Sequence, residues 1–168
     1  MGTLAPPGES SGEIVAVEVL QNTLVRQGIS YWQSIMDAKA FPPRGIVAPR
    51  LLGPLLSNVI LVKVLADDYE YRIVGDALVQ GFGEDFSGKR LSAVIESDAK
   101  FGLGLKLLYD QVRTSGAPIG YRGWVGEDMR GAKFLYHESA ILPMGPQGGA
   151  VDHLLVVSAI IFGNTLVV

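Results

Sequence analysis

The first part of the chain repeats apolar positions with a helical period. Between residues 13 and 38, apolar side chains recur at spacings of three and four, which is typical of an amphipathic helix. Gly28 is expected to divide this stretch into two helices, and the prolines at 42 and 43 end the second one. Residues 1–12 are rich in Pro, Gly and Ser and are expected to form a flexible tail. The stripe of the first helix consists of Ile14, Val17, Leu20 and Leu24.

Beyond residue 57 the period changes, and strands and helices are expected in separate blocks. Two strands joined as a hairpin are predicted at 58–65 and 69–74. Helical segments follow at 76–82, 91–95 and 98–115, the last with Ser97-Asp98 as its N-cap. Three more strands are predicted at 119–125, 133–142 and 151–161. Because the helices are segregated from the strands, the pattern indicates an α+β fold with a five-stranded antiparallel sheet.

Composition narrows the class of protein. The chain has 168 residues, of which 48% are apolar and 18% are charged, so it can form one packed domain. The net charge of −3, without a basic block, argues against nucleic-acid or membrane-surface binding. Cysteine is absent, which excludes disulfides and thiol chemistry. No secretory signal or apolar stretch of membrane-spanning length is visible, so we expect a cytoplasmic protein.

Several local motifs accompany this order of elements. Gly83–Leu91 reads as a turn of the form G-x-D-x-T-G-x-x-L, with Ser87 in place of Thr. The other matching pieces are Tyr31-Trp32, Phe41-Pro42, Arg44, Tyr71–Gly75, Leu142-Pro143-Met144 and Val151-Asp152. Together, over residues 28–162, they resemble the bacterial family of stand-alone proteins with a single PAS domain.

That resemblance implies a PAS-like fold, with the sensory domain at residues 39–168 preceded by N-terminal helices at 13–38. It implies a regulatory module, often without an output domain, and it brings no catalytic residues. Since a fold does not by itself define a function, the candidate sites have to be weighed residue by residue.

Few residues are candidates for catalysis or for holding a cofactor. His137 and His153 are the only histidines, and neither has a second ligand placed for a haem or metal. The acid pairs Asp67-Asp68 and Glu84-Asp85 lie in predicted turns, where Asp is common for backbone reasons. We therefore expect no enzyme activity, no metal and no cofactor.

Aromatic residues at strand and helix spacing form the candidate ligand pocket. In a PAS-like fold the core face of the sheet is also the pocket wall, so these side chains suit either a plain core or a ligand cleft. They are Tyr71, Phe82, Phe101, Tyr121, Trp124 and Tyr136. Arg72 is expected either to pair with Asp76 or Asp85 or to be solvated on its strand. Gly102 and Gly104 lie inside a helical pattern, which favours close packing there over a ligand contact.

Two functions from different classes follow. The preferred one is a sensory module that binds a small apolar ligand or an unknown signalling protein and forms a homodimer through the stripe Ile14, Val17, Leu20 and Leu24. The alternative is a small cone-shaped enzyme, an isomerase or thioesterase, that uses Asp76 or Asp85 with a tyrosine in an apolar pocket. The position of the helical block between the strands favours the module.

Overall fold

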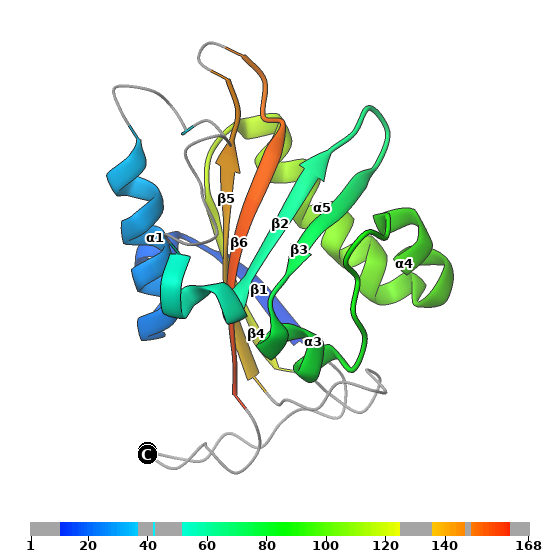
Figure 1. Ribbon diagram of the computed structural model, residues 1–168, viewed down its shortest axis with the longest axis horizontal. Coiled ribbons are helices and arrows are strands. Elements are labelled where there is room, and N and C mark those ends of the chain that lie inside the picture. Colours follow the sequence, from blue (N-terminus) through cyan, green and yellow to red (C-terminus); the bar gives the residue numbers. More distant parts are fainter. Residues whose placement is uncertain (1–10, 37–41, 43–51, 125–135, 147–148, 162–168) are drawn as a thin grey trace.

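The chain folds around one antiparallel sheet with helices on both faces (Figure 1). A computed structural model describes residues 11–36, 42, 52–124, 136–146 and 149–161. Its strands are β1 (Ser11–Val15), β2 (Val59–Val64), β3 (Tyr69–Val74), β4 (Ile119–Trp124), β5 (Tyr136–Met144) and β6 (His153–Ile161). Their order across the sheet is β1-β4-β5-β6-β2-β3. The α+β class is confirmed, and the five expected strands are present; β1 is a sixth, added beyond β4.

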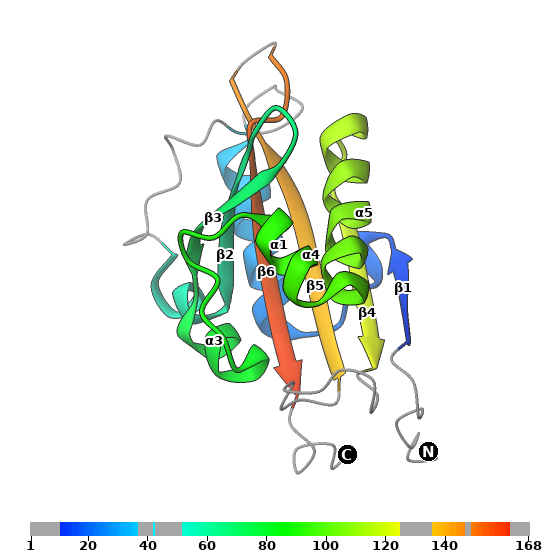
Figure 2. The same ribbon diagram turned by 90° about the vertical axis from the view of Figure 1, so that its right-hand side faces the viewer.

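Three helices cover one face of the sheet, as Figure 2 shows. They are α3 (Asp76–Phe82), α4 (Leu91–Ser97) and α5 (Ala99–Ser115). Asp98 begins α5 by accepting a hydrogen bond from the Phe101 N–H at 3.1 Å, as its N-cap position predicts. Gly116 ends it with φ of 67°, a left-handed conformation that favours glycine. All three helices were expected from the sequence near these positions.

The other face carries α1 (Thr23–Ile35) and the 3₁₀ turns η1 (Val17–Val19) and η3 (Gly53–Asn58). The strands β5 and β6 lie between the two layers, and most of their side chains are buried. Coverage on both sides explains why β6 reads as a nearly continuous apolar run rather than as an alternating one. Apolar clusters fill the space on each side of the sheet.

The predicted N-terminal helix over residues 13–27 is wrong for residues 13–22, and only residues 23–27 are helical. Ile14 lies in β1, where it pairs with Tyr121 of β4, and α1 begins only at Thr23. The pairing depends on glycine, because a Cβ at Gly123 would lie 2.4 Å from the carbonyl oxygen of Ser11. A long-range partner of this kind leaves no trace in the local period, and the apolar spacing alone therefore suggested a helix.

The expected break at Gly28 is also wrong, since this residue lies within α1. A Cβ at Gly28 would come within 2.5 Å of Cγ2 of Val157, so glycine here permits α1 to pack closely on β6. Two of the four residues of the predicted dimer stripe are correspondingly buried. Val17 and Leu20 are 6% and 1% exposed and belong to the apolar cluster beneath α1. They are therefore covered within the chain.

Of the two prolines expected to end the second helix, Pro42 is described, whereas Pro43 lies in the stretch 43–51, which is outside the described residues. The stretch 37–41 is also outside them. Of the predicted flexible tail at 1–12, residues 11 and 12 lie in β1, so that part of the prediction is wrong. Residues 1–10 and the turn after β4 lie outside the described residues. In the part of the chain that is described, no helix is both long and apolar enough to cross a membrane.

Candidate ligand-binding cavity

A cavity of about 510 Å³ lies between α5 and the sheet. Its size is within the range of small-molecule sites, about 300–1,000 Å³. The sheet contributes residues from β1, β2, β4, β5 and β6, and the roof comes from α5 with Phe82 of α3. The apolar and aromatic lining residues are Ile14, Ile60, Phe82, Phe101, Leu105, Leu107, Leu108, Tyr109, Tyr121, Trp124, Ile141 and Val156.

The structure brings four of the six predicted pocket residues to this cavity. Phe82, Phe101 and Tyr121 line it, and Trp124 borders it at the end of β4, although the Trp124 ring packs against its register partner Tyr136 with ring centroids 5.0 Å apart. Tyr71 does not, because it is 1% exposed within the core, where its ring packs against other aromatic side chains. Tyr136 lies on the other face of the sheet, where its hydroxyl donates to Glu138 at 3.1 Å.

The strand period explains the residues that the sequence interpretation missed. Alternate residues of β5 share a face, so His137, Ser139 and Ile141 all line the cavity. Tyr136 and Glu138 then face α1. The same alternation along the predicted strand could have identified His137 and Ser139 as cavity residues beforehand.

The floor of the cavity carries two hydroxyl groups that are directly opposite each other. Ser139 and Ser158 are register partners on β5 and β6, and their Oγ atoms are 2.7 Å apart. Both side chains belong to buried residues, 9% and 4% exposed. This pair places hydrogen-bonding capacity inside a wall that is otherwise mainly apolar.

His137 lies beside this pair on the same strand. Its ring is 5.3 Å from that of Tyr121, centroid to centroid. Burial lowers the pKa of His137 to about 4, because desolvation disfavours the charged imidazolium. The cavity therefore presents a neutral imidazole at physiological pH. Among the described residues, no group of three His, Asp or Glu side chains is placed to hold a metal ion.

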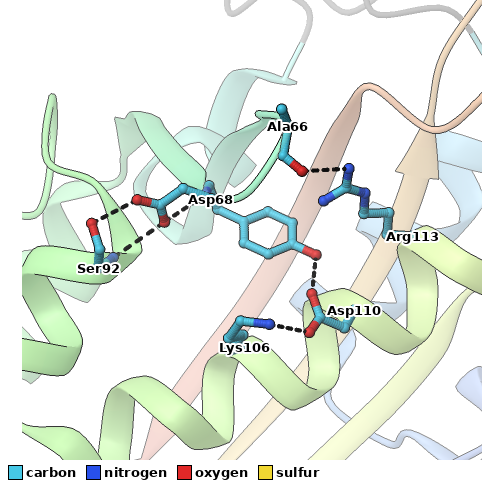
Figure 3. Close-up of polar contacts among 7 residues, drawn as sticks. Ala66, Asp68, Ser92, Lys106, Asp110 and Arg113 are labelled. Carbon is cyan, nitrogen blue, oxygen red and sulfur yellow. Dashed lines mark hydrogen bonds and ion pairs between the residues drawn. The ribbon is translucent and has the colours of Figure 1, made fainter.

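Polar contacts fix the position of the roof at the far end of α5 (Figure 3). Asp68, at the hairpin between β2 and β3, accepts hydrogen bonds from Oγ and N of Ser92 in α4 at 2.6 and 3.2 Å. The Tyr69 hydroxyl donates to Asp110 of α5 at 2.6 Å, and Arg113 lies over the Tyr69 ring, 6.0 Å from its centroid. These contacts hold the C-terminal half of α5 to the hairpin, while its N-terminal half covers the cavity.

The predicted pair of Arg72 with Asp76 or Asp85 does not form. Arg72 instead makes an ion pair with Glu70. Residues two apart on a strand lie on the same face, so Glu70 is close to Arg72 on β3. Asp76 is the exposed first residue of α3. The position of α3 is therefore set by apolar packing, with Leu78 fully buried, and not by this ion pair.

Gly102 and Gly104 of α5 have different surroundings. A Cβ at Gly102 would lie 2.8 Å from the backbone N of Ile95 in α4, whereas a Cβ at Gly104 would meet nothing within 4 Å. Gly102 is thus required by helix packing, as the sequence suggests. Gly104 lies open at the cavity.

This difference predicts opposite effects of the same substitution. Gly102→Ala forces α4 and α5 apart and should lower the free energy of unfolding by about 1–3 kcal/mol. Gly104→Ala adds a better helix former without a clash and should raise it by up to about 1 kcal/mol. Urea unfolding of the two variants beside the wild type measures both changes, and equal effects would show that the packing of α5 is misplaced.

On the opposite face of β5, a buried carboxylate joins the sheet to the start of α1. Glu138 is 6% exposed, and its Oε2 accepts hydrogen bonds from the N–H groups of Gln21 and Asn22 at 2.9 and 2.8 Å. Asn22 in turn caps α1 by accepting from the Leu24 N–H at 2.9 Å. One strand thus connects the cavity with the first turn of α1.

Comparison with known protein families identifies this architecture. A family model described as PAS domain matches residues 21–157, which include α1 and all strands except β1 and the end of β6. The chain belongs to the PAS domain family, as the motifs of the sequence indicate. Among curated proteins, no significant match is found.

Proposed function

We propose that this PAS domain is a sensory module that binds a small molecule in the cavity beneath α5. The observation that carries the proposal is the cavity itself, about 510 Å³ in volume, mainly apolar and with a hydroxyl pair at its floor. A mainly apolar cavity with a small number of converging polar groups is typical of small-molecule sites. Proteins of the family are generally non-enzymatic, which agrees with a binding role.

The proposed signal passes across β5 to α1. His137 and Ser139 face the cavity, and Glu138 between them holds the N–H groups of Gln21 and Asn22. A ligand that shifts β5 therefore also shifts the acceptor on which the start of α1 depends. Such coupling needs a ligand with different affinity for the two arrangements.

The enzyme alternative finds less support in the site. Its candidate acids, Asp76 and Asp85, are both exposed and do not line the cavity. Asp85 accepts a hydrogen bond from the Ser87 N–H at 2.8 Å, the turn role that its position suggests. The one carboxylate among the described lining residues is Asp98, which is exposed and caps α5.

The proposal includes contacts with other protein chains, without naming a partner. PAS domains commonly mediate dimer or partner interactions. Of the predicted dimer stripe, Val17 and Leu20 are buried within the chain, and Ile14 is 42% exposed at the cavity. Val17 and Leu20 therefore do not offer a contact surface, and a homodimer or signalling complex cannot be held by the continuous helical stripe that the sequence suggests.

A fluorescence titration tests binding directly. N-phenyl-1-naphthylamine, a neutral probe that brightens in apolar surroundings, should bind the wild type saturably with one site per chain. In methyl NMR spectra, the bound probe should shift Ile141, which lines the cavity, more than its neighbour Leu142, which faces α1.

The variant Gly104→Phe tests the location. Its side chain leans along α5 over the cavity mouth, and we expect it to weaken probe binding at least about tenfold, or about 1.4 kcal/mol. Gly104→Ala should bind like the wild type and serves as the matched control. Non-saturable fluorescence, or equal binding by both variants and the wild type, would refute the cavity as the site.

A further inference from the structure

The hydroxyl pair at the cavity floor has one more proton than its mutual hydrogen bond uses. Each serine hydroxyl carries one donor and two acceptor lone pairs, and Ser139 and Ser158 share a single contact of 2.7 Å between their Oγ atoms. Whichever hydroxyl donates, the other retains its proton. Because both residues line the cavity, that proton is available to an acceptor on a bound molecule.

The described cavity wall offers no counter-charge at this depth. Its charged lining residues, Asp98 and Lys100, lie at the start of α5, are exposed and have opposite signs. His137, next to the hydroxyl pair, is neutral because burial keeps its pKa at about 4. An ionised group placed at the floor would lose its hydration without gaining a partner, which is strongly unfavourable.

The rest of the wall suits flat apolar groups. Phe82 and Phe101 form an aromatic pair with ring centroids 5.5 Å apart, and the Tyr121 ring lies on the sheet side. Aromatic surfaces of this kind favour offset or edge-on contacts with another ring. The polar pair and the aromatic wall belong to the same cavity, so one molecule can contact both.

We infer that the ligand is an uncharged aromatic molecule with one hydrogen-bond acceptor, such as a ketone or related carbonyl oxygen, that accepts from the Ser139–Ser158 pair. This inference rests on the proposed function and names the chemical class of ligand for the same cavity. It predicts a preference for a neutral carbonyl compound over both the bare hydrocarbon and the corresponding carboxylate.

Three matched competitors for bound N-phenyl-1-naphthylamine test this preference. They are naphthalene, 2-acetylnaphthalene and 2-naphthoate, measured at pH 7. The ketone should displace the probe about three- to tenfold better than naphthalene, the gain expected from one hydrogen bond. It should also displace the probe at least tenfold better than 2-naphthoate, because the carboxylate enters the cavity without a counter-charge.

A double variant, Ser139→Ala with Ser158→Ala, tests the role of the hydroxyl pair. It should bind the fluorescent probe and naphthalene within about twofold of the wild type, while the advantage of the ketone falls below about twofold. Ser34→Ala, on the exposed side of α1, is the control and should keep the wild-type order. The ranking of the three competitors on the wild type remains a test even if the double variant does not fold.

The outcomes separate this inference from the proposed function. If 2-naphthoate binds as well as the ketone, or if the folded double variant keeps the ketone preference, the ligand class is wrong while the cavity remains a binding site. If neither the fluorescent probe nor any competitor binds, the proposed function fails and this inference fails with it.

Discussion

Replacing Glu138 with alanine should lower the free energy of unfolding by about 3–5 kcal/mol. The substitution removes the acceptor of two backbone N–H groups, those of Gln21 and Asn22, at the entry to α1. Hydrogen bonds to a charged group contribute about 1.5–3 kcal/mol each, and two such bonds are lost together here. Equilibrium urea unfolding at pH 7 measures the loss.

Glu138→Gln is the matched control for this prediction. Its amide oxygen can accept from the same two N–H groups, but without the charge that makes such bonds about twice as strong. We expect a loss of about 1–2 kcal/mol. If alanine and glutamine cost the same, or if alanine costs less than about 1 kcal/mol, the carboxylate does not hold α1 to β5.

Acidification should destabilise the protein through His137. The pKa of this residue is about 4 in the folded chain and about 6.5 in an unfolded one, so the unfolded state binds the proton first. Stability is then complete above about pH 6.5, falls as the pH decreases towards 4 and levels off below it. The loss reaches about 3 kcal/mol at most.

The variant His137→Gln isolates this contribution because it cannot take up a proton. Urea unfolding of both proteins between pH 7 and pH 4.5 should give a steeper decline for the wild type. This window avoids lower pH, where protonation of Asp68 and Asp110 also contributes, because hydrogen bonds lower the pKa of both carboxyls despite partial burial. Parallel curves for the two proteins would mean that His137 is not desolvated in the cavity.

Most of the fold follows from local period. Runs of β-branched and aromatic residues bounded by turn residues locate β2 to β6, and the spacing of Phe101, Leu105, Leu108 and Val112 locates α5. The prediction is correct for these segments because the residues that set the period are also the residues that are buried in the core. The local pattern and the tertiary contacts therefore agree.

The N-terminal segment shows where local period fails. Residues 11–15 are too few for a strand to be distinguished from the first turn of a helix, and four of these five are exposed. The strand exists because β4 offers an edge with Gly120 and Gly123, against which β1 can lie closely. No pattern within residues 11–24 indicates this pairing, because the partner strand is about a hundred residues away.

The cavity was only partly predictable for a related reason. The aromatic residues were identified by type, and type does not say which face of a strand a side chain occupies. Tyr136 and Tyr121 lie on different faces because Tyr136 pairs with Trp124 in the register of β4 and β5. Predicting the serine pair requires the register of β5 and β6, and predicting the role of Gly104 requires the position of α5 on the sheet. Both depend on contacts between distant segments.

The central claim is that occupancy of the cavity is transmitted across β5 to the start of α1. The most direct test is the NMR spectrum of the Gln21 and Asn22 amides with and without saturating N-phenyl-1-naphthylamine. Both amide resonances should shift clearly more than those of β3, which does not line the cavity, and neither should shift in Gly104→Phe at the same probe concentration. If the Ile141 methyl responds to the probe while Gln21 and Asn22 do not move, the cavity binds a ligand but β5 does not carry its signal to α1.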